Sequence, residues 1–223
     1  HKTMCSMLDR NSAVEFGMYR RKKTSFIVED VTIRNEFTTI NSICKYAYRK
    51  SYMPFEKFNV EEIKISEPTR RDTFTIEEYR VFYTRMRKWV KDSVDEHELY
   101  MRSLMRDFIL VKTNTFLRFG EIYQLKWHMC KTYSYKNEKL IELELPSTIC
   151  KNRKSRVVLT NGGQYLDRFN ALSKHTDPDD YVWTSKEGKH LSKPVLYKYW
   201  KDLIKTTGMD ELRNPKGGNK HIT

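Results

Sequence analysis

The chain of 223 residues holds 42 lysines and arginines against 29 aspartates and glutamates, which gives a formal net charge of +13. This excess favours an anionic partner, and nucleic acid is the first candidate. Because no segment approaches the about 20 consecutive apolar residues of a membrane span, a membrane partner is the weaker interpretation. The length is enough for one large domain or two small ones.

The cysteines and the motifs that the sequence lacks argue against a metal or nucleotide site. The four cysteines form no Cys-x-x-Cys pair, and no histidine stands near them at zinc-finger spacing. The sequence has no Walker loop, no GxGxxG string and no acidic cluster typical of a two-metal nuclease. We therefore expect free thiols in a reducing compartment, and neither a metal ion nor a cofactor.

A helical pattern covers residues 31–49. Its repeating apolar side chains are Phe37, Ile40, Cys44 and Ala47. Asp30 precedes the pattern and is a candidate N-cap. The first part of the chain is therefore expected to be a small helical domain.

A segment without periodicity follows at residues 67–74 and contains a proline. We expect it to be a linker between a first domain, residues 1–66, and a second domain, residues 75–223. Arg70 and Arg71 lie in this linker and are candidates for contacts to nucleic-acid phosphates.

Two helices are expected at the start of the second domain. Thr75 and Glu78 have the spacing of a capping box, which predicts a helix reaching about Lys91. A second helix is predicted over about 97–114.

Arg118 lies between apolar neighbours at a break between two helical patterns, which we place at Gly120. The first pattern carries Leu104, Phe108 and Val111, and the second carries Glu121, Ile122, Leu125 and Trp127. An arginine near a helix N-terminus suits a planar fork aimed at a phosphate. The alternative is a surface arginine that pairs with Glu121.

An antiparallel hairpin is predicted next. Residues 139–145 alternate apolar and acidic side chains, and residues 156–159 form a second short strand. The turn between them, residues 151–155, is polar and basic. The remaining elements expected are a helix from Asn161, a strand at 181–183, and a helix capped by Ser192 and ended by Gly208. The fold class is thus mostly α with a small antiparallel β-sheet (α+β).

Two of these segments resemble motifs of the tyrosine recombinases, the phage integrase family. Leu117-Arg118-Phe119-Gly120-Glu121, followed by Leu125 and Trp127, resembles the family's first arginine box. Residues 151–158 are similar to its Lys-x-x-Lys-x-Arg-x-Val hairpin, with Val158 where the family usually has proline. The resemblance extends from about residue 30 to the end. Residues 32–41 are similar to the first core-binding helix, and residues 181–208 to the stretch before the second catalytic box.

The resemblance implies roles for individual residues. Arg118 would stabilise charge on the reacting phosphate, and Lys151 would protonate the leaving oxygen, with Lys154 as the weaker candidate. Glu121 would orient Arg118, or would be an ordinary acid at a helix N-terminus. The DNA-binding residues expected are Arg70, Arg71, Arg153, Lys154 and Arg156.

The resemblance also implies a function. It predicts a helical, SAM-like core-binding domain over 1–66 and a catalytic domain over 75–223. Together these domains would perform site-specific recombination through a 3′-phosphotyrosine. The partners would be duplex DNA and sister protomers in a tetrameric synapse, with no membrane. The location would be the cytoplasm of a bacterium or of a phage-infected cell.

Part of the family's machinery is not recognisable in the sequence. No histidine is followed by arginine three residues later, and none of the 14 tyrosines can be placed after such a box. His221 could open the box only if an arginine came next. We therefore expect the nucleophile-bearing C-terminal part to be absent and this fragment to be inactive. The alternatives are a non-catalytic duplex DNA-binding protein on the same fold and a basic RNA-binding protein.

Overall fold

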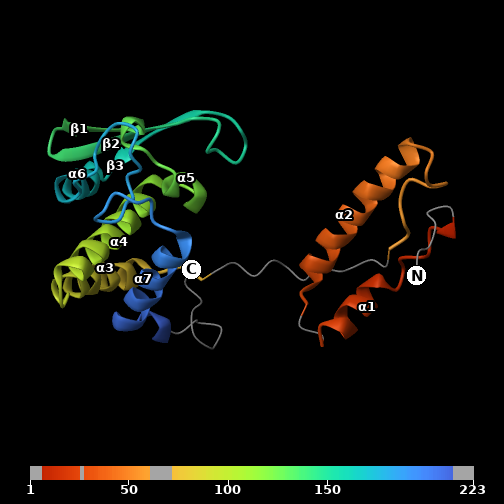
Figure 1. Cartoon of the computed structure of the whole chain (residues 1–223). Helices are drawn as coiled ribbons and strands as arrows, with labels where there is room; N and C mark the ends of the chain where they lie inside the picture. Colours follow the sequence, from red (N-terminus) through yellow and green to blue (C-terminus); the bar gives the residue numbers. More distant parts are fainter. Residues whose placement is uncertain (1–6, 26–27, 61–71, 213–223) are drawn as a thin grey trace. The chain divides into compact units, whose positions relative to one another are not determined.

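The computed structural model describes residues 7–25, 28–60 and 72–212. The chain divides into two compact units, residues 1–70 and residues 71–223, which we call the N-terminal and C-terminal units (Figure 1). Linker residues 67–71, which include Arg70 and Arg71, lie outside the described residues, as does His221.

The described part of the N-terminal unit contains the helices α1, over Phe16–Lys23, and α2, over Asp30–Arg49 (Figure 1). The rings of Phe16 and Phe37 meet edge to face with centroids 5.1 Å apart. Beside them, Arg20 donates two hydrogen bonds to the Glu36 carboxylate, at 2.6 and 2.7 Å. An apolar contact and an ion pair therefore hold α1 against α2.

The helix predicted over 31–49 is confirmed, but its N-cap is Glu29. Asp30, the predicted cap, is the first helical residue, and its carboxylate accepts a hydrogen bond from Arg21 Nη2 at 2.7 Å. Asp30 is thus engaged by α1 and makes no cap of its own.

The C-terminal unit is built around α4, which contacts α3, α6 and α7 (Figure 1). Its helices are α3 (Ile76–Lys91), α4 (Glu96–Thr115), α5 (Phe119–Tyr123), α6 (Gly163–Leu172) and α7 (Lys193–Thr206), with 3-10 turns η2 (Trp127–Met129) and η3 (Met209–Glu211). The predicted capping box of α3 is confirmed, since Thr75 Oγ1 accepts from the Glu78 backbone N–H at 3.2 Å and Glu78 Oε2 accepts from the Thr75 N–H at 2.7 Å.

A three-stranded antiparallel sheet completes this unit. Its strands, in the order β1-β2-β3, are β1 (Cys130–Tyr135), β2 (Glu138–Leu145) and β3 (Arg156–Asn161). Ile141, Leu143 and Leu145 are buried, as the alternation predicted. The predicted pairing of β2 with β3 is confirmed, with Leu143 opposite Val158. The α+β fold class is therefore confirmed.

Two local predictions are wrong. Residues 181–183 form no strand: Tyr181 makes only an isolated bridge to Lys126. Val182 and Trp183 are instead fully buried, and Trp183 Nε1 donates to the Ile122 carbonyl at 2.8 Å. Asn161 is the last residue of β3, and α6 begins after Gly162, whose φ of +117° favours glycine.

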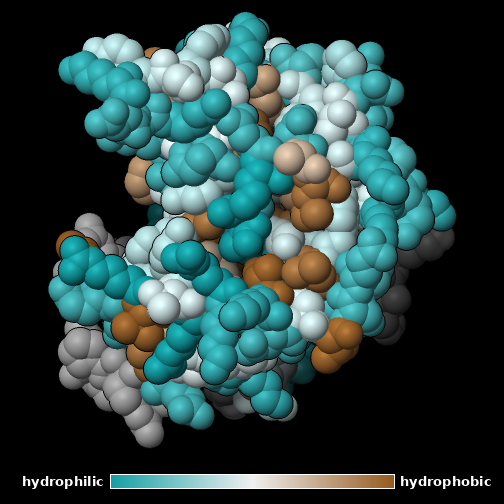
Figure 2. Space-filling model, turned by 90° about the vertical axis from the view of Figure 1, so that its left-hand side faces the viewer, coloured by the Kyte–Doolittle hydropathy of each residue, from teal (hydrophilic) through white to brown (hydrophobic). Residues whose placement is uncertain are grey.

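Hydrophilic side chains predominate on the face shown in Figure 2, where apolar residues lie in small groups. No helix in the described ranges is long and apolar enough to cross a membrane.

A buried carboxylate ties α4 to α6. Asp107, on α4, is fully buried and accepts two hydrogen bonds from Arg106, at 2.9 and 3.0 Å. Arg168, on α6, adds a second pair of hydrogen bonds, one of them at 3.1 Å from its Nε. Removing a partner from a buried ion pair leaves an unmatched charge and is strongly destabilising.

We expect Asp107→Ala to lower the free energy of unfolding by about 3–5 kcal/mol, because it leaves two arginines facing an empty buried position. The measurement is urea unfolding followed by circular dichroism. The matched control is Glu96→Ala on the same helix. Glu96 pairs with Lys186 at 2.7 Å but its side chain is 82 % exposed, so solvent screens the pair and the loss should be small compared with that of Asp107→Ala. Equal losses in the two variants would contradict the structural role of Asp107.

Candidate functional site

Arg118 lies at the junction between α4 and α5. Helix α4 ends at Thr115, and Arg118 is the N-cap of α5 with an extended backbone. The predicted position at a helix N-terminus is therefore confirmed. The predicted break at Gly120 is wrong, because Gly120 lies inside α5 and the chain turns at Phe116, whose φ is +52°.

Buried apolar residues hold this junction in place. Leu117 and Ile122, on either side of Arg118, are buried, and the ring of Phe119 packs on Phe108 of α4 with centroids 5.9 Å apart. The Arg118 side chain itself is 59 % exposed. A rigid backbone therefore presents an accessible guanidinium.

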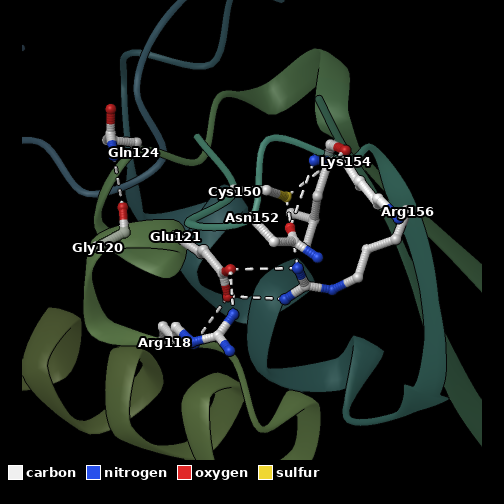
Figure 3. A network of polar contacts seen from close by, with 9 residues as sticks. Arg118, Gly120, Glu121, Gln124, Cys150, Asn152, Lys154 and Arg156 are labelled. Atoms are coloured by element: carbon white, nitrogen blue, oxygen red, sulfur yellow. Dashed lines mark hydrogen bonds and ion pairs between the residues drawn. The ribbon is translucent and has the colours of Figure 1, made fainter. Parts of the chain in front are cut away.

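The Glu121 carboxylate is the centre of the site (Figure 3). It is buried and accepts from the Arg118 backbone N–H at 2.9 Å and from Arg118 Nη1 at 3.2 Å. Arg156, on β3, donates to both carboxylate oxygens, at 2.7 and 3.2 Å. Glu121 thus caps the first turn of α5 and also contacts the Arg118 guanidinium.

These contacts shift the protonation equilibria of the network. Burial by itself would raise the pKa of Glu121, but the hydrogen bonds from Arg156 and Arg118 outweigh it, and the pKa is lowered below its ordinary value. The hydrogen bond to Glu121 correspondingly raises the pKa of Arg156. The carboxylate is therefore ionised at neutral pH, and its charge is matched within the protein.

Arg156 is half-buried, and its guanidinium faces Glu121. Besides its two hydrogen bonds to Glu121, its Nη1 lies 3.4 Å from the sulfur of Cys150, which is buried. Its predicted role was a contact to DNA, but in this structure its fork is occupied by the Glu121 carboxylate (Figure 3). The structure thus gives Arg156 the geometry of a support for Glu121.

The tip of the hairpin carries the predicted lysines. Residues 151–155 are all exposed, and the turn is closed by the Arg153 backbone N–H, which donates to the Cys150 carbonyl at 2.9 Å. Lys151 directly follows Cys150 in the chain, and Arg156 contacts the Cys150 sulfur. Arg156 in turn binds Glu121, which contacts Arg118, so these contacts link the base of the hairpin tip to the Arg118 junction. The structure therefore connects the two motifs, which are far apart in sequence.

An aromatic cluster supports the other end of α5. The ring of His190 stacks on Tyr181 with centroids 3.9 Å apart and lies against Tyr123 at 4.3 Å. His190 Nε2 also lies 2.9 Å from the Tyr123 carbonyl. No pattern in the sequence predicts this cluster, because its three residues come from separate segments and share no local pattern.

No group of three His, Cys, Asp or Glu side chains within residues 7–25, 28–60 and 72–212 could hold a metal ion. The charged groups that the described part of the site brings together are arginines, lysines and one carboxylate.

Comparisons with known proteins show which fold this chain has. No protein-family model and no curated protein sequence matches the chain. Solved structures do match. The Tn1549 transposon integrase (residues 82–397), in complex with circular intermediate DNA, gives a TM-score of 0.64 at 13 % identity, over 98 % of this chain and 69 % of that one. This chain has the fold of the tyrosine recombinases.

Two other tyrosine-recombinase structures show the same likeness. XerH site-specific recombinase, bound to palindromic difH substrate in a post-cleavage complex, gives a TM-score of 0.59 at 18 % identity, over 86 % of this chain and 51 % of that one. A lambda integrase (75–356) dimer bound to a COC′ core site gives 0.57 at 13 % identity, over 93 % and 66 %. The chain thus spans about half of XerH and about two thirds of the lambda integrase fragment.

Glu121→Gln should lower the free energy of unfolding at pH 7 by about 1–3 kcal/mol, because a neutral amide turns an N–H group toward the arginines. The pKa of Glu121 is lowered by folding, so its stabilising contribution is present above the ordinary carboxyl value of 4.5 and is lost as the pH falls through the lowered folded value. The difference between wild type and variant should therefore be constant near neutral pH and shrink in acid.

The measurement is chemical unfolding across a pH series. The control is Glu138→Gln, which changes an exposed carboxylate at the start of β2 and should leave stability unchanged at every pH. A difference for Glu121→Gln that does not depend on pH would show that its charge is not the stabilising feature.

Proposed function

We propose that this chain is the DNA-binding and phosphate-engaging part of a tyrosine recombinase that acts in site-specific DNA recombination, as an integrase. One observation carries the proposal. The exposed Arg118 fork is held at a helix N-terminus by a buried carboxylate, and the same carboxylate binds the strand that carries the lysine hairpin. This arrangement occurs within a tyrosine-recombinase fold.

DNA as the partner has two supports. The Tn1549 integrase structure is a complex with circular intermediate DNA, and the XerH and lambda integrase structures are bound to a difH substrate and to a COC′ core site. The chain also has a net charge of +13, which favours a polyanion. We therefore assign duplex DNA as the partner, and Arg70, Arg71, Arg153 and Lys154 as phosphate contacts. Sister protomers assembled on the DNA as a tetramer, in the cytoplasm of a bacterium or of a phage-infected cell, complete this proposal.

The chemistry follows from the charges at the site. Arg118 would donate two parallel hydrogen bonds to non-bridging oxygens of a phosphate, where negative charge accumulates in the transition state. Lys151, at the exposed hairpin tip, would protonate the leaving oxygen. Glu121 would keep Arg118 oriented before DNA binds. These roles use side chains of the chain itself.

In the proposed enzyme, the nucleophilic tyrosine lies outside this sequence. A core-binding domain (1–66) and a linker (67–74) would precede the catalytic domain, residues 75–223. The boundary between the two compact units falls between residues 70 and 71, within that linker. Because no His-x-x-Arg string occurs in the sequence, we assign that box and the tyrosine to residues that this sequence does not contain.

The second candidate is a non-catalytic duplex DNA-binding protein on the same fold. The absence of a His-x-x-Arg string from the sequence favours it. Both candidates require DNA binding, and they differ in whether Arg118 and Lys151 act in strand cleavage.

We expect the affinity of the chain for duplex DNA to fall steeply with salt, with log K against log[salt] sloping by roughly −0.9 for each phosphate neutralised. The measurement is fluorescence anisotropy with a labelled duplex over a salt series. Lys154→Ala should make the slope shallower by about one unit if it removes one phosphate contact. A single-stranded RNA of the same length is the comparison, and it should bind more weakly. An affinity that does not depend on salt, or a preference for the RNA, would contradict the proposal.

In a protein that joins this chain to the nucleophile-bearing part, Arg118→Lys should reduce covalent protein–DNA complex formation by about 10²- to 10³-fold, the effect of losing one donor to the transition state. Lysine cannot make the two parallel hydrogen bonds of arginine. The measurement is a suicide-substrate cleavage assay, with thermal melts to show that folding is kept.

The matched control for this assay is Arg80→Lys, an exposed arginine on α3, which should leave cleavage unchanged. The 223-residue chain by itself should form no covalent complex. A covalent complex with the chain alone would place the nucleophile among its own tyrosines. Normal cleavage by the Arg118→Lys variant would remove Arg118 from the active site and favour the non-catalytic candidate.

A further inference from the structure

Phe116 combines two unfavourable features. Its side chain is 89 % exposed, and its backbone has the left-handed conformation, with φ +52° and ψ +25°. Bulky L-residues rarely adopt this conformation, and the position after a helix usually carries glycine. A large apolar side chain at a strained, exposed position suggests a role in binding.

The end of α4 does not need the phenyl ring. The Phe116 backbone N–H donates to the Lys112 carbonyl at 3.0 Å, which any residue except proline could do. Two side chains of the last turn bond back to carbonyls of the turn before it: Thr115 Oγ1 donates to the Val111 carbonyl, at 2.8 Å, and Asn114 Nδ2 to the Leu110 carbonyl, at 2.7 Å. Glycine would close the helix equally well and without strain.

The connection between α4 and α5 presents Phe116 beside Arg118. Thr115 and Leu117 are buried, whereas Phe116 and Arg118 are exposed, so the side chains alternate along this short segment. The aromatic ring and the guanidinium therefore leave the protein from the same short connection, two residues apart. Anything that covers one of them comes close to the other.

We propose that Phe116 packs on the deoxyribose of the nucleotide next to the phosphate that Arg118 binds. This inference rests on the proposed function, because it takes a DNA strand as the ligand of Arg118. In a duplex the base faces are covered by their stacked neighbours, but the deoxyribose next to each phosphate offers an apolar surface whatever the base sequence. Lys112, one turn before Phe116 on α4, and the overall excess of positive charge favour a nucleic-acid strand over a protein segment at this position. Contact with DNA would remove the exposed ring from water.

The first test compares DNA affinities of the full 223-residue chain. Phe116→Gly should weaken binding to a short duplex by about 5-fold, the lower end of the effect of losing one aromatic contact to a nucleotide. It should leave the melting temperature unchanged or higher by up to about 4 °C, because glycine accepts the left-handed backbone. Phe116→Trp keeps an aromatic ring and should bind within about twofold of wild type.

The control for backbone strain is Ser51→Gly, which replaces another residue of positive φ, at +58°, in the N-terminal unit. It should leave DNA affinity unchanged. Wild-type affinity in Phe116→Gly would overturn the inference, and so would an equal loss in Phe116→Gly and Phe116→Trp. If wild type does not bind DNA at all, the proposed function itself fails, so the two failures are distinguishable.

The second test is photo-crosslinking. The photoreactive amino acid p-benzoylphenylalanine at position 116 should crosslink to the duplex. The same amino acid at position 94 should not. Val94 is 86 % exposed and precedes the first turn of α4, so it lies about 30 Å from Phe116 along the 20 residues of this helix. Equal crosslinking at both positions, or none at position 116 under conditions where wild type binds, would overturn the inference.

Discussion

The candidate site depends on the buried carboxylate of Glu121. A buried charge is costly unless hydrogen bonds and an opposite charge match it. Four donated hydrogen bonds, from the Arg118 backbone, the Arg118 side chain and the two terminal nitrogens of Arg156, meet its two oxygens. Moving any of these groups would leave part of the charge unmatched. The start of α5, the Arg118 side chain and strand β3 are therefore held in one arrangement.

A second buried carboxylate, Asp107, holds two helices of the C-terminal unit together. It joins α4 to α6 through Arg168, while Glu121 joins α5 to β3. The connection from α4 to α5 lies between these two anchored regions. Its backbone is consequently well defined, and its exposed side chains, Phe116 and Arg118, are presented to solvent by a rigid support.

Such a support matters for chemistry on phosphates. An arginine that is oriented before the ligand arrives stabilises developing negative charge without first having to reorganise. In Arg118, one guanidinium nitrogen contacts Glu121 and the side chain stays largely exposed, so orientation and accessibility are combined. Arg118 is therefore oriented by Glu121 in the protein without bound DNA.

Local patterns in the sequence were sufficient for the long helices, the β2–β3 pairing and the arginine at a helix start, because capping and periodicity depend on neighbouring residues. These patterns did not predict β1, which is an edge strand without apolar alternation, and they wrongly predicted a strand at the buried segment 181–183. Only the tertiary structure decided that Arg156 faces Glu121 and that Phe116 is left exposed. The reason is physical: Glu121 and Arg156 are 35 residues apart in sequence, and folding alone determines which charges meet and which side chains remain uncovered.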